Sequence, residues 1–219
     1  MVEYNFNEEY NRILDEIIES RRSIRSFKPE IPPEKMIKEI VRAGMLAPYA
    51  TLLVGSKNDF RRFFIIRKGE TRDRIATIMH NQVKEVYKGI REKAEKNPEI
   101  QAKVQGLLTT LKSRVETGIP NMEDAPYFIV IAEKKGSMSV EMQSIAHCLQ
   151  NVWLKSTALG LGFELISATE QIAENQDFCQ ILGVPPKKYG INGCLIGYPA
   201  KIPRRSPHPD PEKCTKWIN

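Results

Sequence analysis

The sequence carries a cluster of cationic and hydroxyl side chains close to its N-terminus, in residues 21–26. Arg21, Arg22 and Arg25 supply three guanidinium groups there, and Ser23 supplies a hydroxyl donor between them. A guanidinium is permanently charged and presents planar, forked N–H donors whose geometry matches phosphate oxygens. The cluster therefore indicates either a solvated basic turn or a site for the phosphate of a small ligand.

A second basic cluster lies near the other end of the chain, at residues 201–205, where Arg204 and Arg205 follow Lys201. Most charged side chains are solvated, so each cluster alone favours an ordinary basic surface. Two clusters at opposite ends of the chain, however, suit a phosphorylated small molecule that both ends hold. This hypothesis requires Arg22 and Arg205 to line one crevice.

Motifs for hydrolysis or nucleotide binding are absent from the sequence. It contains no Gly-x-Ser-x-Gly elbow, no His-Glu-x-x-His motif and no Walker loop, and the pair Gly160 and Gly162 lacks the third glycine of a dinucleotide fingerprint. Its four cysteines are far apart and lack zinc-site spacing, so we expect no metal site. With three histidines the chain offers few acid–base groups, and an enzyme of this kind would rely on a cofactor for its reactivity.

The composition is that of a globular protein with a core, with 41% hydrophobic and 27% charged residues over 219 positions. A net charge of +6 permits an anionic ligand or nucleic acid, but no aromatic-rich strand stands beside a basic cluster, which disfavours nucleic-acid binding. No apolar run approaches the roughly 20 residues of a membrane span, and we see no secretory signal. We therefore expect a cytoplasmic protein with no membrane partner and with reduced cysteines.

Apolar periodicity predicts helices and strands that alternate along the chain, which indicates a single α+β or α/β domain over residues 1–219. The predicted helices cover residues 7–20, 33–47, 71–95, 99–116, 140–159 and 170–182. The predicted strands cover residues 63–66, 127–132, 163–166 and 193–197. The run 127–132 is apolar throughout, as expected for a strand buried on both faces, and 140–159 is the most apolar of the helices.

Two segments fall outside this predicted core. Residues 71–118 are charged on most faces and form a predicted helical insertion, which is either a lid or dimer arm or a solvent-facing hairpin. Residues 198–219 carry five prolines and no periodicity, so they form a predicted extended tail. A tail of that length must lie on another surface to be ordered.

Three stretches of the sequence together resemble the flavin-dependent nitroreductase family. They are IIESRRSIRSFKPEIPPEKMIKEIVRAGMLAP at residues 17–48, QSIAHCLQNVWLKSTALGLGF at residues 143–163, and ILGVPPKKYGINGCLIGYPAKIPRRSP at residues 181–207. The first is similar to the family's arginine-rich turn, proline stretch and helix ending in Ala-Pro. The second is similar to its central helix, and the third to its Leu-Gly-x-Pro and Gly-Tyr-Pro-Ala ending. The order along the chain is also that of the family.

The resemblance implies a three-layer α/β/α fold with a mixed, mainly antiparallel central sheet, in an intertwined homodimer that binds FMN at the subunit interface. It implies that NADH or NADPH reduces the flavin by hydride transfer, and that the flavin then reduces a small nitro-, quinone- or enone-like acceptor in a ping-pong mechanism. No side chain needs to act as a base, because flavin N5 carries the chemistry. The tail would wrap the partner subunit. The alternative is a flavin-binding protein of the same fold without reductase activity.

The resemblance also assigns residues to the phosphate end of FMN. Arg21, Arg22 and Ser23 would hold the phosphate and the ribityl chain, and Arg204 and Arg205 would close on the phosphate from the far end of the chain. Both basic clusters would thus serve one ligand.

Other residues are assigned by the resemblance to the flavin ring. Arg25 would lie near the pyrimidine edge, where a positive charge stabilises the reduced ring. A backbone N–H would address flavin N5 from the segment of Ile166, Ser167 and Ala168. The partner subunit would contribute the segment of Pro48, Tyr49 and Ala50.

The sequence departs from the family pattern after Pro48. Many members continue with Ser-x-x-Asn-x-Gln-Pro-Trp, whereas this chain has Tyr49 at the serine and Leu52 at the asparagine. The polar contact of that asparagine to the ribityl chain or ring would be missing, and Tyr49 could fill space over the flavin.

Overall fold

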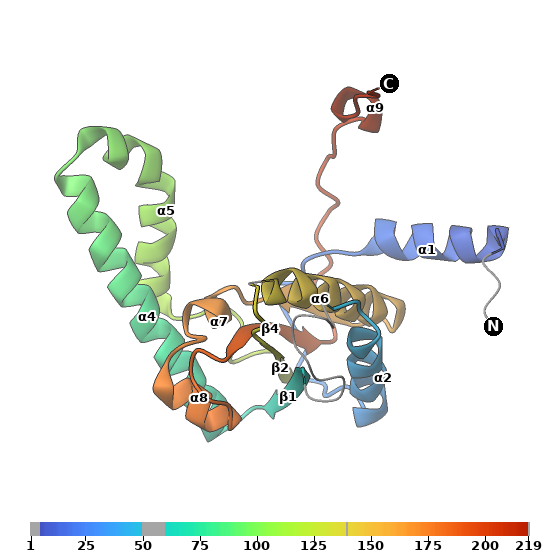
Figure 1. The fold of residues 1–219 in the computed structure, drawn as a ribbon, viewed down its shortest axis with the longest axis horizontal. Coiled ribbons are helices and arrows are strands. Elements are labelled where there is room, and N and C mark those ends of the chain that lie inside the picture. The colour runs from blue at the N-terminus through green and yellow to red at the C-terminus, as the bar shows by residue number, and fades with distance from the viewer. Residues whose placement is uncertain (1–4, 50–59, 139, 219) are drawn as a thin grey trace.

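The computed structural model describes residues 5–49, 60–138 and 140–218, and Figure 1 shows their arrangement around one sheet. The strands are β1 (Arg61–Arg67), β2 (Tyr127–Lys134), β3 (Gly162–Leu165) and β4 (Tyr189–Gly197). They lie in the order β1-β2-β4-β3, and each neighbouring pair is antiparallel. An isolated parallel bridge joins Ser23 to Phe163. The predicted mixed, mainly antiparallel sheet of an α+β fold is confirmed.

Strand β2 lies in the middle of the protein. Both faces of the strand carry apolar side chains, so both faces can be covered by helices. Residues 127–132 are at most 2% exposed, as predicted for a strand covered on both faces. Its register places Ile129 opposite Cys194 and Ile131 opposite Asn192 on β4. The edge strand β1 is less covered than β2, since Ile65 is 40% exposed.

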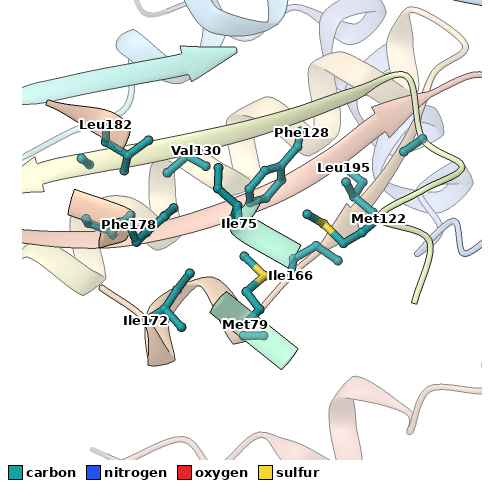
Figure 2. Packing of buried hydrophobic residues seen from close by; sticks show 14 of the residues in the cluster. Ile75, Met79, Met122, Phe128, Val130, Ile166, Ile172, Phe178, Leu182 and Leu195 are labelled. Carbon is teal, nitrogen blue, oxygen red and sulfur yellow. The ribbon is translucent and has the colours of Figure 1, made fainter. Parts of the chain in front are cut away.

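Helices cover both faces of the sheet and complete the three-layer α/β/α arrangement. On one face, α4 (Glu70–Glu95), α7 (Ala168–Gln171) and α8 (Gln176–Leu182) pack on side chains such as Phe128 and Val130 of β2, as Figure 2 shows. On the other face, α2 (Glu34–Met45) and α6 (Glu141–Ala158) enclose Ile129 and Ile131. Alternation of side chains along β2 thus divides the core into two clusters.

The single helix predicted at 170–182 is wrong. The structure has two short helices there, α7 and α8, separated by a turn that ends at Asn175. Asn175 caps α8, because its side-chain oxygen accepts a hydrogen bond from the Phe178 N–H at 3.0 Å. Because the chain turns between α7 and α8, Ile172 and Phe178 both point into the same core cluster.

The N-terminal helix α1 (Glu8–Ser20) extends away from the sheet in Figure 1. Asn7 caps it, since its side-chain oxygen accepts the Tyr10 N–H at 2.9 Å. None of the residues of α1 is buried, and the apolar side chains of Tyr10, Leu14 and Ile18 are exposed. The helix therefore has an apolar face that the described chain leaves about half exposed or more.

Two further segments leave the body of the protein in Figure 1. Helix α4 continues through a turn at Asn97 into α5 (Pro98–Thr117), so the two helices predicted in the insertion form a hairpin. The tail after β4 is extended apart from the short α9 (Pro211–Cys214), and its Trp217 and Ile218 are exposed. Among the described residues, no helix is long and apolar enough to cross a membrane.

Candidate functional site

The two basic clusters meet in one cavity of about 480 Å³, which we call the cationic cavity. Its wall includes Arg21, Arg22, Ser23 and Arg25 from the turn after α1 and Arg204 and Arg205 from the tail. Residues almost the whole chain length apart thus face the same space. None of the residues that line it comes from the helical hairpin.

Backbone hydrogen bonds explain why the two ends converge. The turn after α1 runs beside β3, because the Ile24 N–H donates to the carbonyl oxygen of Phe163 at 2.9 Å. Four residues later it runs beside the start of the tail, where the Lys28 N–H donates to Tyr198 O at 2.8 Å and the Ala200 N–H to Ser26 O at 3.0 Å. The same short segment therefore places the first cluster and the chain that leads to the second.

Close packing between the turn and β3 depends on Gly162. A Cβ atom at this position would lie 2.7 Å from a side-chain carbon of Ile24, which is much shorter than a normal contact. Ile24 is itself 5% exposed and belongs to the core. The absence of a side chain at Gly162 thus allows the arginine-bearing turn to pack directly on the sheet.

Arg21 lies over the ring of Trp153, with 4.1 Å between its guanidinium carbon and the ring centroid. Trp153 also stacks on Phe163, with ring centroids 4.5 Å apart and planes inclined by 15°. The indole Nε1–H of Trp153 donates to the carbonyl oxygen of Arg22 at 3.2 Å. One side chain of α6 therefore contacts two consecutive arginines of the turn.

Arg22 is held by the turn itself and retains an unused donor. Its Nη1 donates to the carbonyl oxygens of Glu19 at 2.6 Å and Arg21 at 2.7 Å. Its Nε is buried and meets no hydrogen-bond acceptor within the part of the chain that the structure describes. Burying a charged donor without an acceptor is costly, so this position favours an anion in the cavity.

Arg205 approaches the turn from the tail. Its Nη1 lies 3.6 Å from Oε2 of Glu19, and both side chains are more than half exposed. Such a solvated pair contributes little to stability, so Arg205 can exchange this partner for an anion at small cost.

An apolar cleft of about 360 Å³ lies between α6 and β3. Trp153 and Phe163 line it together with Met142 and Leu149, and Gln150 adds an amide. Arg21 lines the cationic cavity and Trp153 lines the apolar cleft. Because Arg21 lies over the ring of Trp153, the two spaces meet at this contact. The arrangement suits a ligand with an anionic group at one end and a flat apolar body at the other.

The segment of Ile166, Ser167 and Ala168 follows β3 directly. Ile166 and Ala168 are buried, whereas Ser167 is exposed. The Ile166 N–H already donates to Gly193 O at 2.9 Å, so a backbone donor for a ligand would have to come from Ser167 or Ala168.

Pro48 and Tyr49 line neither the cationic cavity nor the apolar cleft of their own chain. The ring of Tyr49 stacks on Phe60 with centroids 3.5 Å apart, and the carbonyl oxygen of Pro48 accepts from Arg61 Nη2 at 3.4 Å. Ala50 and Leu52 lie outside the described residues.

Sequence reasoning did not single out Trp153 or Glu164, although both interact with arginines of the turn. For Trp153 the available signal is its indole N–H, which needs an acceptor when it is partly buried. Glu164 is 8% exposed on β3, and burial raises the pKa of its carboxyl group. A hydrogen bond from Asn121 Nδ2 at 2.8 Å and the charges of Arg25 and Arg114 act in the opposite direction.

Comparison with known proteins finds a family model and solved structures that are similar to this chain. Residues 18–198 match the model of the Nitroreductase family. A nitroreductase with bound FMN from Bacteroides fragilis is similar to the chain at 16% identity, with 98% of this chain and 100% of that one covered and a TM-score of 0.69. A nitroreductase with bound FMN from Desulfitobacterium hafniense gives 19% identity, 98% and 100% coverage and a TM-score of 0.67. An iodotyrosine deiodinase bound to FMN and 3-iodo-L-tyrosine gives 16% identity, 90% and 95% coverage and a TM-score of 0.65. A search of curated proteins finds no match.

Proposed function

Because the chain belongs to the nitroreductase family, whose members are flavin-dependent oxidoreductases, we propose that it is an FMN-dependent oxidoreductase that works as a homodimer. NADH or NADPH is its electron donor, and a small nitro-, quinone- or enone-like molecule is its acceptor. The single observation that carries the proposal is the cationic cavity, where arginines from both ends of the chain face one space.

The residues of the cavity fit the phosphate of FMN. The buried Nε of Arg22 has no acceptor within the described chain, and a phosphate oxygen is the kind of group that would satisfy it. Arg21, Ser23, Arg204 and Arg205 surround the same space and would neutralise the charge and fix the phosphate in place.

The apolar cleft beside the cavity would accept the flavin ring. Arg25 would place a positive charge near the pyrimidine edge, and a backbone N–H of Ser167 or Ala168 would face N5. When bound, FMN would supply the redox chemistry, accepting a hydride from NADH or NADPH and then reducing the acceptor in a ping-pong cycle. The chain's own residues bind and orient the cofactor, and no side chain needs to act as a base.

The homodimer is supported by apolar surface that the described chain leaves exposed. Tyr10, Leu14 and Ile18 form one face of α1, and the tail carries Trp217 and Ile218. A second copy would cover these side chains and bring the segment of Pro48, Tyr49 and Ala50 to the flavin ring.

Two measurements test the proposal. Purified protein, as isolated or after incubation with FMN, should show the visible absorption bands of bound flavin. Anaerobic addition of NADH or NADPH should then bleach these bands. A colourless protein that takes up no FMN would overturn the proposal. Bound flavin that neither nicotinamide bleaches would leave a flavin-binding protein without reductase activity.

A further inference from the structure

We propose that Trp153 is a positioning residue that sets the arginines of the cationic cavity and thereby makes the site selective for a phosphorylated flavin over riboflavin. The inference rests on the proposed function, because it assumes that FMN occupies the cavity and the cleft. It adds a residue that would not touch the phosphate and would act through Arg21 and Arg22.

The contacts of Trp153 point to this role. Its ring is the surface on which the guanidinium of Arg21 lies at 4.1 Å, and its Nε1–H donates to the carbonyl oxygen of Arg22 at 3.2 Å. The ring is fixed in turn by stacking on Phe163 at 4.5 Å. The partners of Trp153 on the turn are therefore both phosphate-binding candidates, and its partner on the sheet is a buried core residue.

An arginine without such a support would lose much of its value as a phosphate ligand. A free arginine side chain samples many rotamers, and ordering it on binding costs conformational entropy. A guanidinium already held over an indole ring samples fewer positions, and its N–H donors can still bind a phosphate. Trp153 thus pre-organises Arg21 before the ligand arrives.

The place of Trp153 between the two spaces gives the selectivity. Its ring lines the apolar cleft, whereas Arg21 lines the cationic cavity. Removing the ring would disturb the arginines that meet the phosphate, which riboflavin lacks. The effect should therefore fall on FMN far more than on riboflavin.

The test compares the dissociation constants of FMN and riboflavin for the full-length protein and its variants. Trp153→Leu removes both the ring and the N–H, and Trp153→Phe keeps a ring but removes the N–H. We expect Trp153→Leu to weaken FMN binding by roughly 5- to 30-fold more than riboflavin binding, the range for one cation–π contact and one hydrogen bond. Both flavins lose the contact of their ring with the indole in the cleft, so the ratio of the two losses reports the effect on the arginines. Trp153→Phe should retain most of the preference for FMN.

A double-mutant cycle tests whether Trp153 acts through Arg21. Trp153→Leu should add little to the loss of FMN affinity caused by Arg21→Met, because the arginine that it positions is already gone. Tyr87→Leu is a matched control, since it removes an aromatic ring 5.8 Å from the guanidinium carbon of Arg91, on the hairpin. That variant should bind both flavins as the wild type does.

The outcomes separate the inference from the proposed function. Wild-type protein that binds no FMN would overturn both. If the wild type binds FMN, two results would overturn only the role of Trp153. One is an equal loss of affinity for FMN and riboflavin in Trp153→Leu. The other is a loss of FMN affinity from Trp153→Leu that adds in full to the loss from Arg21→Met. Should Trp153→Leu fail to fold, Trp153→Phe takes its place. A positioning role requires this variant to lower the FMN-to-riboflavin affinity ratio measurably below that of the wild type, and an unchanged ratio would overturn it.

Discussion

Arg61 and Glu133 form an ion pair inside the protein, with 2.6 Å between Arg61 Nε and Glu133 Oε1 and with side chains that are 0% and 4% exposed. Arg61 Nη1 also donates to the carbonyl oxygens of Gly44 at 2.7 Å and Ala47 at 3.1 Å. Gly44 lies in the last turn of α2 and Ala47 two residues beyond its end, where carbonyls lack the regular intrahelical donors. The pair therefore joins the first two strands to the segment that continues into Pro48 and Tyr49.

Loss of Arg61 should be strongly destabilising. Arg61→Met would leave the carboxylate of Glu133 buried without its cation and would remove a donor from the carbonyls of Gly44 and Ala47, so we expect the free energy of unfolding to fall by about 3–5 kcal/mol. Urea denaturation measures this change. Arg67→Met is the matched control, because the Arg67–Glu34 pair is more than half exposed on both sides and should cost less than about 1 kcal/mol. Equal effects for the two variants would contradict the prediction.

Glu164 should make stability fall as the pH rises. Burial raises the pKa of this carboxyl group above its value in the unfolded chain, so the folded state holds the proton more tightly. Its contribution is thus favourable below the unfolded pKa of about 4.3 and is lost as the pH rises through the raised folded pKa. Glu164→Gln cannot ionise and keeps an oxygen that can accept the Asn121 donor. Relative to the wild type, this variant should gain stability between pH 4 and pH 8 in a series of urea titrations, and a constant difference would rule out the prediction.

Much of the fold could be predicted from the local pattern of apolar residues, but the break between α7 and α8 could not. The apolar run 127–132 and the three- and four-residue spacing in 140–159 each indicate their element without knowledge of the rest of the chain. The break at Asn175 was missed because apolar Ile172 and Cys179 are seven residues apart and continue a helical spacing across it, although asparagine is a frequent helix cap.

In the candidate site, too, local sequence identifies single residues but not their partners in the fold. The arginines at both ends of the chain could be singled out by residue type, because guanidinium groups suit phosphate wherever they fold. The pair of Arg61 with Glu133 and the stack of Arg21 on Trp153 join residues more than 70 and 130 positions apart. No local spacing records such partners, so only the folded chain reveals them.

Arg22 should contribute more to FMN affinity than Arg205. Arg22 is fixed by two carbonyls and holds a buried donor without an acceptor among the described residues, whereas Arg205 is exposed and paired with Glu19. We expect Arg22→Gln to weaken FMN binding by about 10- to 100-fold, the value of a charge-assisted hydrogen bond, and Arg205→Gln by less than about 10-fold. Calorimetric titration gives both constants. A larger effect for Arg205→Gln would place the phosphate nearer the tail than the turn.

The exposed apolar face of α1 should hold the dimer together. Leu14 is 49% exposed in the single chain, so a charge there would cost little in a monomer. If a second copy covers this face, Leu14→Glu would bury an unpaired carboxylate at the interface, which is costly. We therefore expect Leu14→Glu to shift the mass measured by light scattering from dimer towards monomer at micromolar concentration, and to weaken FMN binding if the partner completes the site. Asp15→Lys, on the polar side of the same helix, should leave the dimer intact. A Leu14→Glu variant that stays dimeric would show that subunits associate through another surface.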